Sequence, residues 1–406
     1  MAGISDPGVP FKDRLRRLRE RAGLSRPVLG GLVGRSGEWV KALEGGRLLT
    51  PRLPLLLRLA EVLGVDDLAE LTGDERLTTA SYTKAAHEQL SDVAQALATY
   101  PMVIGDGPAD VDGVISRVRQ MWELWHGTHR HRTAIAGLIP DILQDARRAV
   151  RRADGNDRRA ALAAEAQVYH LTQLFLSNQP ASEQVWLSGD RAMTAAQDAD
   201  SPYAMAAAVW YLNHVFRDAG QQHEARVQLA LDAIRLLDFE RSEEDRALWG
   251  LLYLAIALSH AKMGREGDAW HYWDHADYAA SALGDQYTHP WLMFGRGIVD
   301  GYAVDILNDL MKPGDAVQRA DRLDLSLVPS ATRRSRHTIQ IARAFYLNRE
   351  PVATVHLLRK AEDEAPETIK FDPFTRGALI DLAENGGTVV REEARMLAQR
   401  IGIQPA

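Results

Sequence analysis

Residues 23–47, GLSRPVLGGLVGRSGEWVKALEGGR, decide how the N-terminal part of this chain is expected to fold. Ser25 and Ser36 each stand where a helix can begin, because a serine hydroxyl accepts a hydrogen bond from a free N–H of the first helical turn. Gly34, between them, suits a tight turn. The stretch therefore predicts two short helices joined by a turn.

Apolar residues at helical spacing predict a further helix on each side of this pair. The fourth helix is expected to begin near Pro51 or Pro54 and to end at Gly64. Helices this short are not stable alone, so the four must share one small core. The positions expected to face that core are Phe11, Leu15, Leu18 and Ala22, then Val28, Leu29 and Leu32, then Val40 and Leu43, then Leu55, Leu56, Leu59 and Leu63.

Charge is distributed unevenly along the chain. Residues 11–58 carry twelve Lys or Arg against four Asp or Glu, a net charge of +8. The whole chain has a net charge of -7, so the remainder carries -15. A basic segment on an acidic body predicts an anionic partner at one end of the molecule.

Composition excludes several classes of protein. The 406 residues include no cysteine, which excludes disulfides, thiolate nucleophiles and cysteine metal sites. No apolar run approaches the ~20 residues of a membrane span, and residues 1–14 contain no apolar core of a secretory signal. These features predict a cytoplasmic protein without contact to a membrane.

The rest of the chain is expected to be helical almost throughout. Helical hairpins are expected around four turn signatures, which are Gly220–Ala225, Gly264–Ala269, Lys312–Ala316 and Asn348–Ala353. Their spacing is longer than a tetratricopeptide repeat but suits hairpins of that kind, which stack into a superhelix. A non-repetitive helical bundle is the alternative. The expected division is a flexible arm over 1–10, a first domain over 11–76, a helical connector over 77–108 and a repeat domain over 109–406.

The first domain also carries a known motif set, and residues 11–64 resemble the phage-repressor-like helix-turn-helix family, usually called XRE. The matching residues are Leu15-x-x-Leu18-Arg19, Gly23-Leu24-Ser25, Val33-Gly34-Arg35-Ser36-x-x-Trp39-Val40, Leu43-Glu44-x-Gly46-Arg47, Pro54-x-Leu56 and Leu59-Ala60-x-x-Leu63-Gly64-Val65. The resemblance implies a lambda-repressor-like domain in which residues 37–44 enter the major groove of operator DNA, with dimers bound to two half-sites. The DNA-contacting residues that it implies are Arg26, Arg35, Ser36, Gly37, Glu38, Lys41 and Arg47.

Four residues either depart from the usual pattern of the family or allow two interpretations. Gly37 leaves a usual base-reading position without a side chain, and Gly30–Gly31 is expected to loosen its helix by about 1 kcal/mol per glycine relative to alanine. Trp39 could touch a thymine methyl, but packing between helices is the favoured interpretation. The alternative for the whole segment is a four-helix adaptor that does not touch DNA.

A helix-turn-helix joined to such repeats also resembles the peptide-responsive RRNPP regulators, in which a groove asparagine holds the backbone of a bound peptide. Trp210, Asn213 and Arg217 share one helical face, which makes Asn213 the best match to that asparagine. Tyr169 and Tyr253 complete the expected ligand-binding set. The simpler interpretation is that aromatic residues at helical spacing belong to the core.

Other clusters predict no further chemistry. His126, His129 and His131 are expected to lie in a polar turn, and the basic run that begins at Arg147 on a solvated helix face. No nucleophile, phosphate-loop or paired-acid motif is present, so neither an enzyme, a cofactor nor a metal is expected.

The sequence thus favours an all-α, ligand-responsive DNA-binding regulator that acts as a homodimer, with operator DNA and a peptide or small molecule as partners. A helical protein-interaction scaffold with a helix-turn-helix adaptor is the alternative.

Overall fold

The computed structural model describes residues 9–73, 84–103, 109–216 and 222–403. Over these ranges the regular structure is helical, with no β-strand, which confirms the all-α prediction. None of the helices in the described part combines the length and apolar character needed to cross a bilayer.

The N-terminal unit, termed the head, contains five short helices. Their bounds are α1 Phe11–Arg21, α2 Arg26–Leu32, α3 Gly37–Glu44, α4 Leu53–Leu63 and α5 Leu68–Thr72. Most of the predicted core forms, since Leu15, Leu29 and Leu56 are fully buried, but Ala22, just after α1, is exposed. The expectation for α2 was wrong at two positions, because Val28 is 50% exposed and Leu32 is 47% exposed. Only a narrow stripe of α2 faces the small core.

The rest of the described chain, termed the body, packs around larger cores. Its first half contains α7 Leu90–Ala98, α8 Val111–Gly127, α9 His131–Ala136, α10 Ile139–Arg152, α11 Gly155–Leu176, α12 Ser182–Asp198 and α13 Pro202–Phe216. Its second half contains α14 His223–Ile234, α15 Glu243–Lys262, α16 Glu266–Leu283, α17 Arg296–Asp309, α18 Pro313–Ala320, α19 Ala331–Leu347, α20 Pro351–Glu364, α21 Pro366–Phe371, α22 Pro373–Asn385 and α23 Thr388–Arg400.

The segment expected to be a connector is in part a component of the body. Residues 74–83 lie outside the described residues, and α7 begins only at Leu90. Val93 and Leu97 of α7 are fully buried in the main core of the body, and α7 packs against α10. The apolar face of α7 explains this placement, because a helix with such a face must bury it.

Three of the four predicted hairpin turns form. Gly264 adopts a φ of 75° between α15 and α16, the left-handed conformation that favours glycine. Lys312 precedes α18, and Asn348 ends α19 before α20. The Gly220 signature falls partly outside the described residues.

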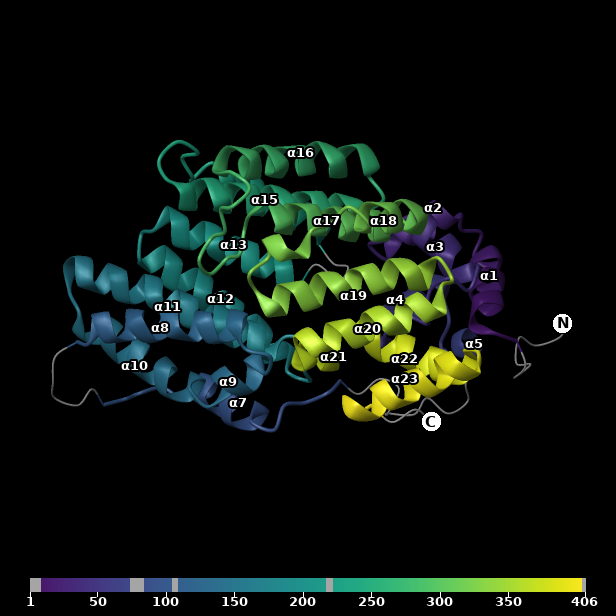
Figure 1. Cartoon of the computed structure of the whole chain (residues 1–406), viewed down its shortest axis with the longest axis horizontal. Coiled ribbons are helices and arrows are strands. Elements are labelled where there is room, and N and C mark those ends of the chain that lie inside the picture. The colour runs from purple at the N-terminus through teal and green to yellow at the C-terminus, as the bar shows by residue number, and fades with distance from the viewer. Residues whose placement is uncertain (1–8, 74–83, 104–108, 217–221, 404–406) are drawn as a thin grey trace.

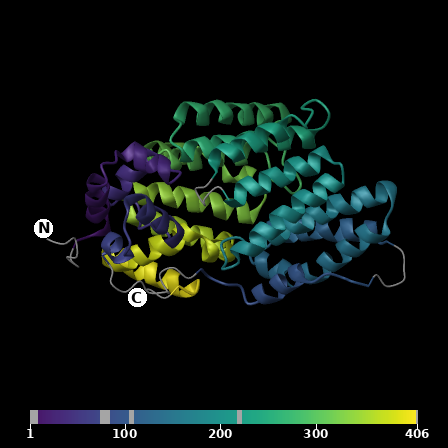
Figure 2. The ribbon, with the colours of Figure 1, turned by 180° about the vertical axis from the view of Figure 1, so that it is seen from behind.

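The head lies at one end of the molecule, beside the C-terminal helices α22 and α23, and the opposite end is formed by α8, α10 and α11 (Figure 1). The reverse view in Figure 2 shows the same arrangement. Residues 11–72 are therefore next to the part of the chain that is furthest from them in sequence.

Candidate nucleic-acid interface

The turn between α2 and α3 depends on close backbone contacts. Gly34 has a φ of 68°, and the N–H of Arg35 donates to the carbonyl of Gly30 at 2.8 Å. A Cβ atom on Gly30 would lie 2.7 Å from the carbonyl oxygen of Ser36, whereas one on Gly31 would meet nothing within 4 Å. A glycine is thus needed at position 30, because a side chain there would keep the turn away from α2. The expectation that a glycine loosens α2 without a packing benefit applies only to Gly31.

Both predicted caps form. The Ser25 hydroxyl accepts from the N–H of Val28 at 3.3 Å, and the Ser36 hydroxyl accepts from the N–H of Trp39 at 3.1 Å. Each bond satisfies one of the N–H groups that a helix leaves without an internal partner at its start. Ser36, which was predicted to contact DNA, is buried, and its hydroxyl already accepts the hydrogen bond that caps α3.

Gly37 has a packing role that the sequence did not indicate. A Cβ atom at this position would lie 3.1 Å from the Cα of Pro27 in α2. The absent side chain therefore lets the start of α3 lie directly against α2.

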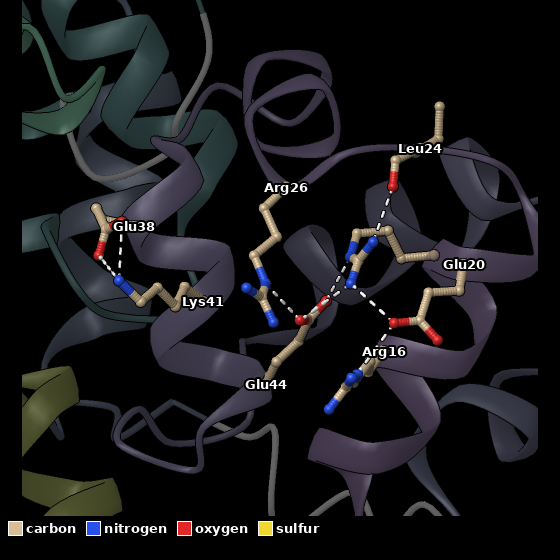
Figure 3. A network of polar contacts seen from close by, with 8 residues as sticks. Arg16, Glu20, Leu24, Arg26, Glu38, Lys41 and Glu44 are labelled. Carbon is tan, nitrogen blue, oxygen red and sulfur yellow. Dashed lines mark hydrogen bonds and ion pairs between the residues drawn. The ribbon is translucent and has the colours of Figure 1, made fainter.

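Glu44, at the end of α3, is the centre of an ionic network within the head (Figure 3). Arg19 Nε donates to Glu44 Oε1 at 2.5 Å, and Arg26 Nε donates to Glu44 Oε2 at 2.7 Å. The Glu44 side chain is 2% exposed. Arg26, predicted to contact DNA, therefore also has a structural partner inside the head.

Electrostatics in this network favour the charged carboxylate. Burial alone would raise the pKa of Glu44, but hydrogen bonds from Arg19 and Arg26 and their positive charges lower it below its ordinary value. The hydrogen bond to Glu44 raises the pKa of Arg19. A buried carboxylate with two guanidinium partners holds α1, α2 and α3 together.

The opposite side of α3 carries the exposed charged residues predicted for DNA. Lys41 Nζ lies 3.0 Å from Glu38 Oε2, with side chains 51% and 57% exposed. Figure 3 shows this pair on the side of α3 away from Glu44. An exposed pair of this kind is weak, so either residue can be drawn to a new partner.

The remaining predicted DNA contacts are half-buried. The Arg35 guanidinium lies 6.0 Å from the ring centre of Trp39, and its Nη1 donates to the carbonyl of Gly34 at 3.2 Å. Trp39 packs against the core of the head, which agrees with its favoured interpretation. Arg47 lies just after α3 in the loop that leads to α4.

The ligand-binding residues predicted in the body do not line an open groove. Trp210 is fully buried against Tyr302, with ring centres 6.3 Å apart. Asn213 is 3% exposed, and its Nδ2 donates to the carbonyl of Val209 at 3.2 Å within α13. In this arrangement the two side chains are core residues, which argues against the predicted peptide clamp. Arg217 lies outside the described residues.

The two predicted tyrosines are also engaged in the body, at separate places. The Tyr169 hydroxyl donates to Glu165 at 3.2 Å and accepts from Arg147 Nε at 3.2 Å. Tyr253 is half-buried and stacks on His275 at a ring distance of 4.6 Å. The four described residues of the predicted set thus do not form one site.

Two of the sequence expectations about polar clusters were wrong in part. His129 is exposed in a turn as expected, but His126 and His131 are buried, and His126 contacts Ser330 and the carbonyl of Trp291, both at 2.9 Å. Arg147 is buried as well, and its Nη2 donates to the carbonyl of Leu97 at the end of α7 at 3.0 Å. Their roles depend on residues far away in sequence.

Comparison with known families agrees with the geometry of the head. Residues 12–71 match the family model described as a helix-turn-helix domain. The match covers α1 to α5 almost completely. The chain therefore carries an N-terminal helix-turn-helix domain, a fold that serves DNA-binding regulators. No curated protein that was compared matches the chain.

Proposed function

We propose that this protein is an effector-controlled transcription regulator that binds operator DNA as a dimer, with α3 in the major groove. The observation that carries the proposal is the helix-turn-helix domain itself, in which capped α2 and α3 meet at a glycine turn. The net charge of +8 over residues 11–58 supports it, because phosphate contacts dominate affinity for DNA.

Lys41 and Glu38 are the side chains best placed to read bases. Both are exposed on the side of α3 that faces away from the core of the head. Lysine pairs with guanine O6 or N7 or with phosphate, and glutamate accepts from cytosine N4. One head offers few such readers, so two heads on half-sites about one helical turn apart would supply the missing specificity.

An open cavity in the body is the place we assign to the effector. It has a volume of about 390 Å³ and lies between α13, the start of α15 and residues 289–291. Tyr203 and Trp291 provide aromatic surface, and Arg241 pairs with the buried Asp245 at 2.7 Å. Aromatic walls with a few polar groups are typical of small-molecule sites.

A hydroxyl in this cavity is ready to donate to a ligand. The N–H of Leu292 donates to His289 Nδ1 at 3.1 Å, so the proton of the neutral ring lies on Nε2. Burial lowers the pKa of His289 to about 3, which keeps the ring neutral. His289 Nε2 lies 2.8 Å from the Tyr203 oxygen and donates to it. The Tyr203 O–H can therefore donate to a carbonyl or carboxylate of an effector.

Selection from a randomised duplex library tests the proposal directly. The full-length protein is expected to enrich one sequence with two related half-sites, and gel shifts on that sequence are expected to reveal a complex with two protein copies. Equal, purely salt-governed binding to enriched and random duplexes contradicts the proposal. A stoichiometric protein that co-purifies without DNA specificity favours the scaffold alternative.

A further inference from the structure

The head touches the body at both ends of the recognition helix α3. At its start, the turn over residues 34–36 meets the turn between α15 and α16 and the beginning of α14. After its end, the loop that leads to α4 meets α22. The two contacts therefore bracket the helix that is proposed to enter DNA.

The first contact joins the cap of α3 to a glycine of the body. A Cβ atom on Gly264 would lie 2.5 Å from the Cβ of Ser36, so only glycine lets the two segments come this close. Ser36 is 7% exposed in this position. The body thus covers the residue that caps the N-terminus of the recognition helix.

A buried histidine lies beside the same turn of the head. His223, the first residue of α14, is 2% exposed. Burial lowers the pKa of His223 to about 3, the charge of Arg35 contributes in the same direction, and the backbone carbonyl of Gly34 opposes it. Two residues of the head therefore influence the pKa of a side chain in the body.

The second contact lies just beyond the end of α3. A Cβ atom on Gly377 in α22 would lie 2.7 Å from Cδ1 of Leu49. The leucine side chain thus rests on the helix backbone where α22 has no side chain of its own. This contact is independent of the one at Gly264, because it involves another helix of the body.

From these contacts we infer that the structure is a closed state in which the body holds the head and blocks the entry of α3 into DNA. The inference rests on the proposed function, because it concerns how the same DNA-binding helix is regulated. For the head to move away from the body, the contacts between Ser36 and Gly264 and between Leu49 and Gly377 must both break.

The dimensions of DNA explain the block. Base edges lie at the bottom of a major groove that is about 8.5 Å deep and about 12 Å wide. The N-terminal residues of α3 must reach that depth, so the phosphate walls of the groove must pass on both sides of it. Because Gly264 lies directly against Ser36, the body would occupy space that one such wall needs.

One helix connects the proposed effector cavity to the first contact. The start of α15 contributes Glu244 and Asp245 to the cavity, and its other end leads directly into Gly264. The 20 residues of α15 span about 30 Å at 1.5 Å per residue. An effector that shifts α15 by 1–2 Å, a displacement of the order seen in helix-shift switches, would loosen the contact with Ser36.

Engineered cysteines test the closed state, because the chain contains none of its own. The full-length double variant Ser36→Cys with Gly264→Cys is expected to form a disulfide after a small separation, since bonded cysteines have Cβ atoms about 3.8 Å apart. Leu49→Cys with Gly377→Cys, joined by a short thiol crosslinker, provides an independent lock. Each single-cysteine variant is the control for its pair.

Both locks are expected to lower the affinity for the selected operator at least about 100-fold, because the open fraction that can bind becomes negligible. Reduction of the disulfide is expected to restore binding. Failure of both pairs to crosslink, or crosslinked protein that binds DNA as tightly as the reduced protein, overturns the closed state.

A release variant provides the opposite test. His223→Arg places a charge beside Arg35, Lys262 and Arg226. It is expected to raise operator affinity about 10-fold or more, since a minor open state is populated at about 10% or less. His260→Arg is the matched control, because His260 is also buried in the body but lies beside Asp268, at 3.5 Å.

Unchanged affinity in His223→Arg contradicts the inference. Protein that crosslinks at both pairs but binds no duplex in any reduced or released form contradicts the proposed function instead, and leaves the contact between head and body established. The two failures are therefore distinguishable.

Discussion

Glu44 at the end of α3 accepts a hydrogen bond from Arg19 of α1 at 2.5 Å, and both side chains are at most 9% exposed. This pair joins the first helix of the head to the helix proposed to read DNA. Arg26 of α2 binds the second carboxylate oxygen, so three helices share one buried charge. The position of α3 in the head thus depends on ion pairing as well as on the apolar core.

Removal of the carboxylate is expected to destabilise the head. Glu44→Ala removes the buried carboxylate partner of Arg19, which then keeps only Glu20 and the carbonyl of Leu24, and a broken buried pair costs about 3 kcal/mol or more. Hydrogen exchange over residues 11–72 measures the loss separately from the body. Glu61→Ala is the control, because Glu61 forms an exposed pair with Arg58 and its loss is expected to change stability by less than about 1 kcal/mol. Equal protection in both variants contradicts a structural role for Glu44.

Acid is expected to weaken the head through the same residue. The pKa of Glu44 is lowered in the folded state, so its stabilising contribution is complete above the ordinary pKa of 4.5 and is lost as the pH falls through the lowered value. Hydrogen exchange of the head measured between pH 7 and pH 3 checks this dependence. In Glu44→Gln the corresponding loss below pH 4.5 is expected to be absent, and an unchanged profile would rule out Glu44 as its source.

Two neighbouring glycines are expected to respond in opposite directions to alanine. Gly30→Ala places a Cβ atom 2.7 Å from a backbone oxygen of the turn, so the head must distort and lose stability. Gly31→Ala meets nothing within 4 Å and is expected to stabilise α2 by up to about 1 kcal/mol. Thermal unfolding of both variants provides the comparison. Similar effects of the two substitutions would refute the packing role of Gly30.

Charge reversal is expected to distinguish the DNA-facing side of α3 from the rest of the head. Lys41→Glu is predicted to lower affinity for the selected operator at least about 10-fold, through loss of a phosphate or base contact and added repulsion. Arg58→Glu is the matched control, because Arg58 also forms an exposed pair with a glutamate three positions away. A loss of the same size in both variants would point to net charge alone and not to a site on α3.

Much of the head could be predicted because its signals are local. A serine hydroxyl reaches an N–H three residues away, and Gly34 needs its left-handed conformation whatever lies around it. The same reasoning placed three hairpin turns in the body. Local sequence signals could not predict that Val28 and Leu32 remain exposed. The apolar face of a helix does not indicate how much of that face the neighbouring helices cover.

The roles of charged and aromatic residues were harder to predict, because they depend on distant partners. Arg26 was expected to approach DNA, and the structure places a carboxylate from 18 residues further along the chain beside it. Trp210 and Asn213 share a helical face in the sequence, and neighbouring helices bury that face. No local signal at Gly264 or His223 indicated that either would meet the head.

The sequence by itself determined the helices, their caps, the glycine turn and the basic charge of the head, since these follow from residues within a few positions of one another. The tertiary structure alone decided which charges pair inside the head, which aromatic residues are buried, and that Ser36 rests against Gly264. The contact between Ser36 and Gly264 joins segments more than 200 residues apart, and the formation of all these contacts depends on how whole helices pack around shared cores.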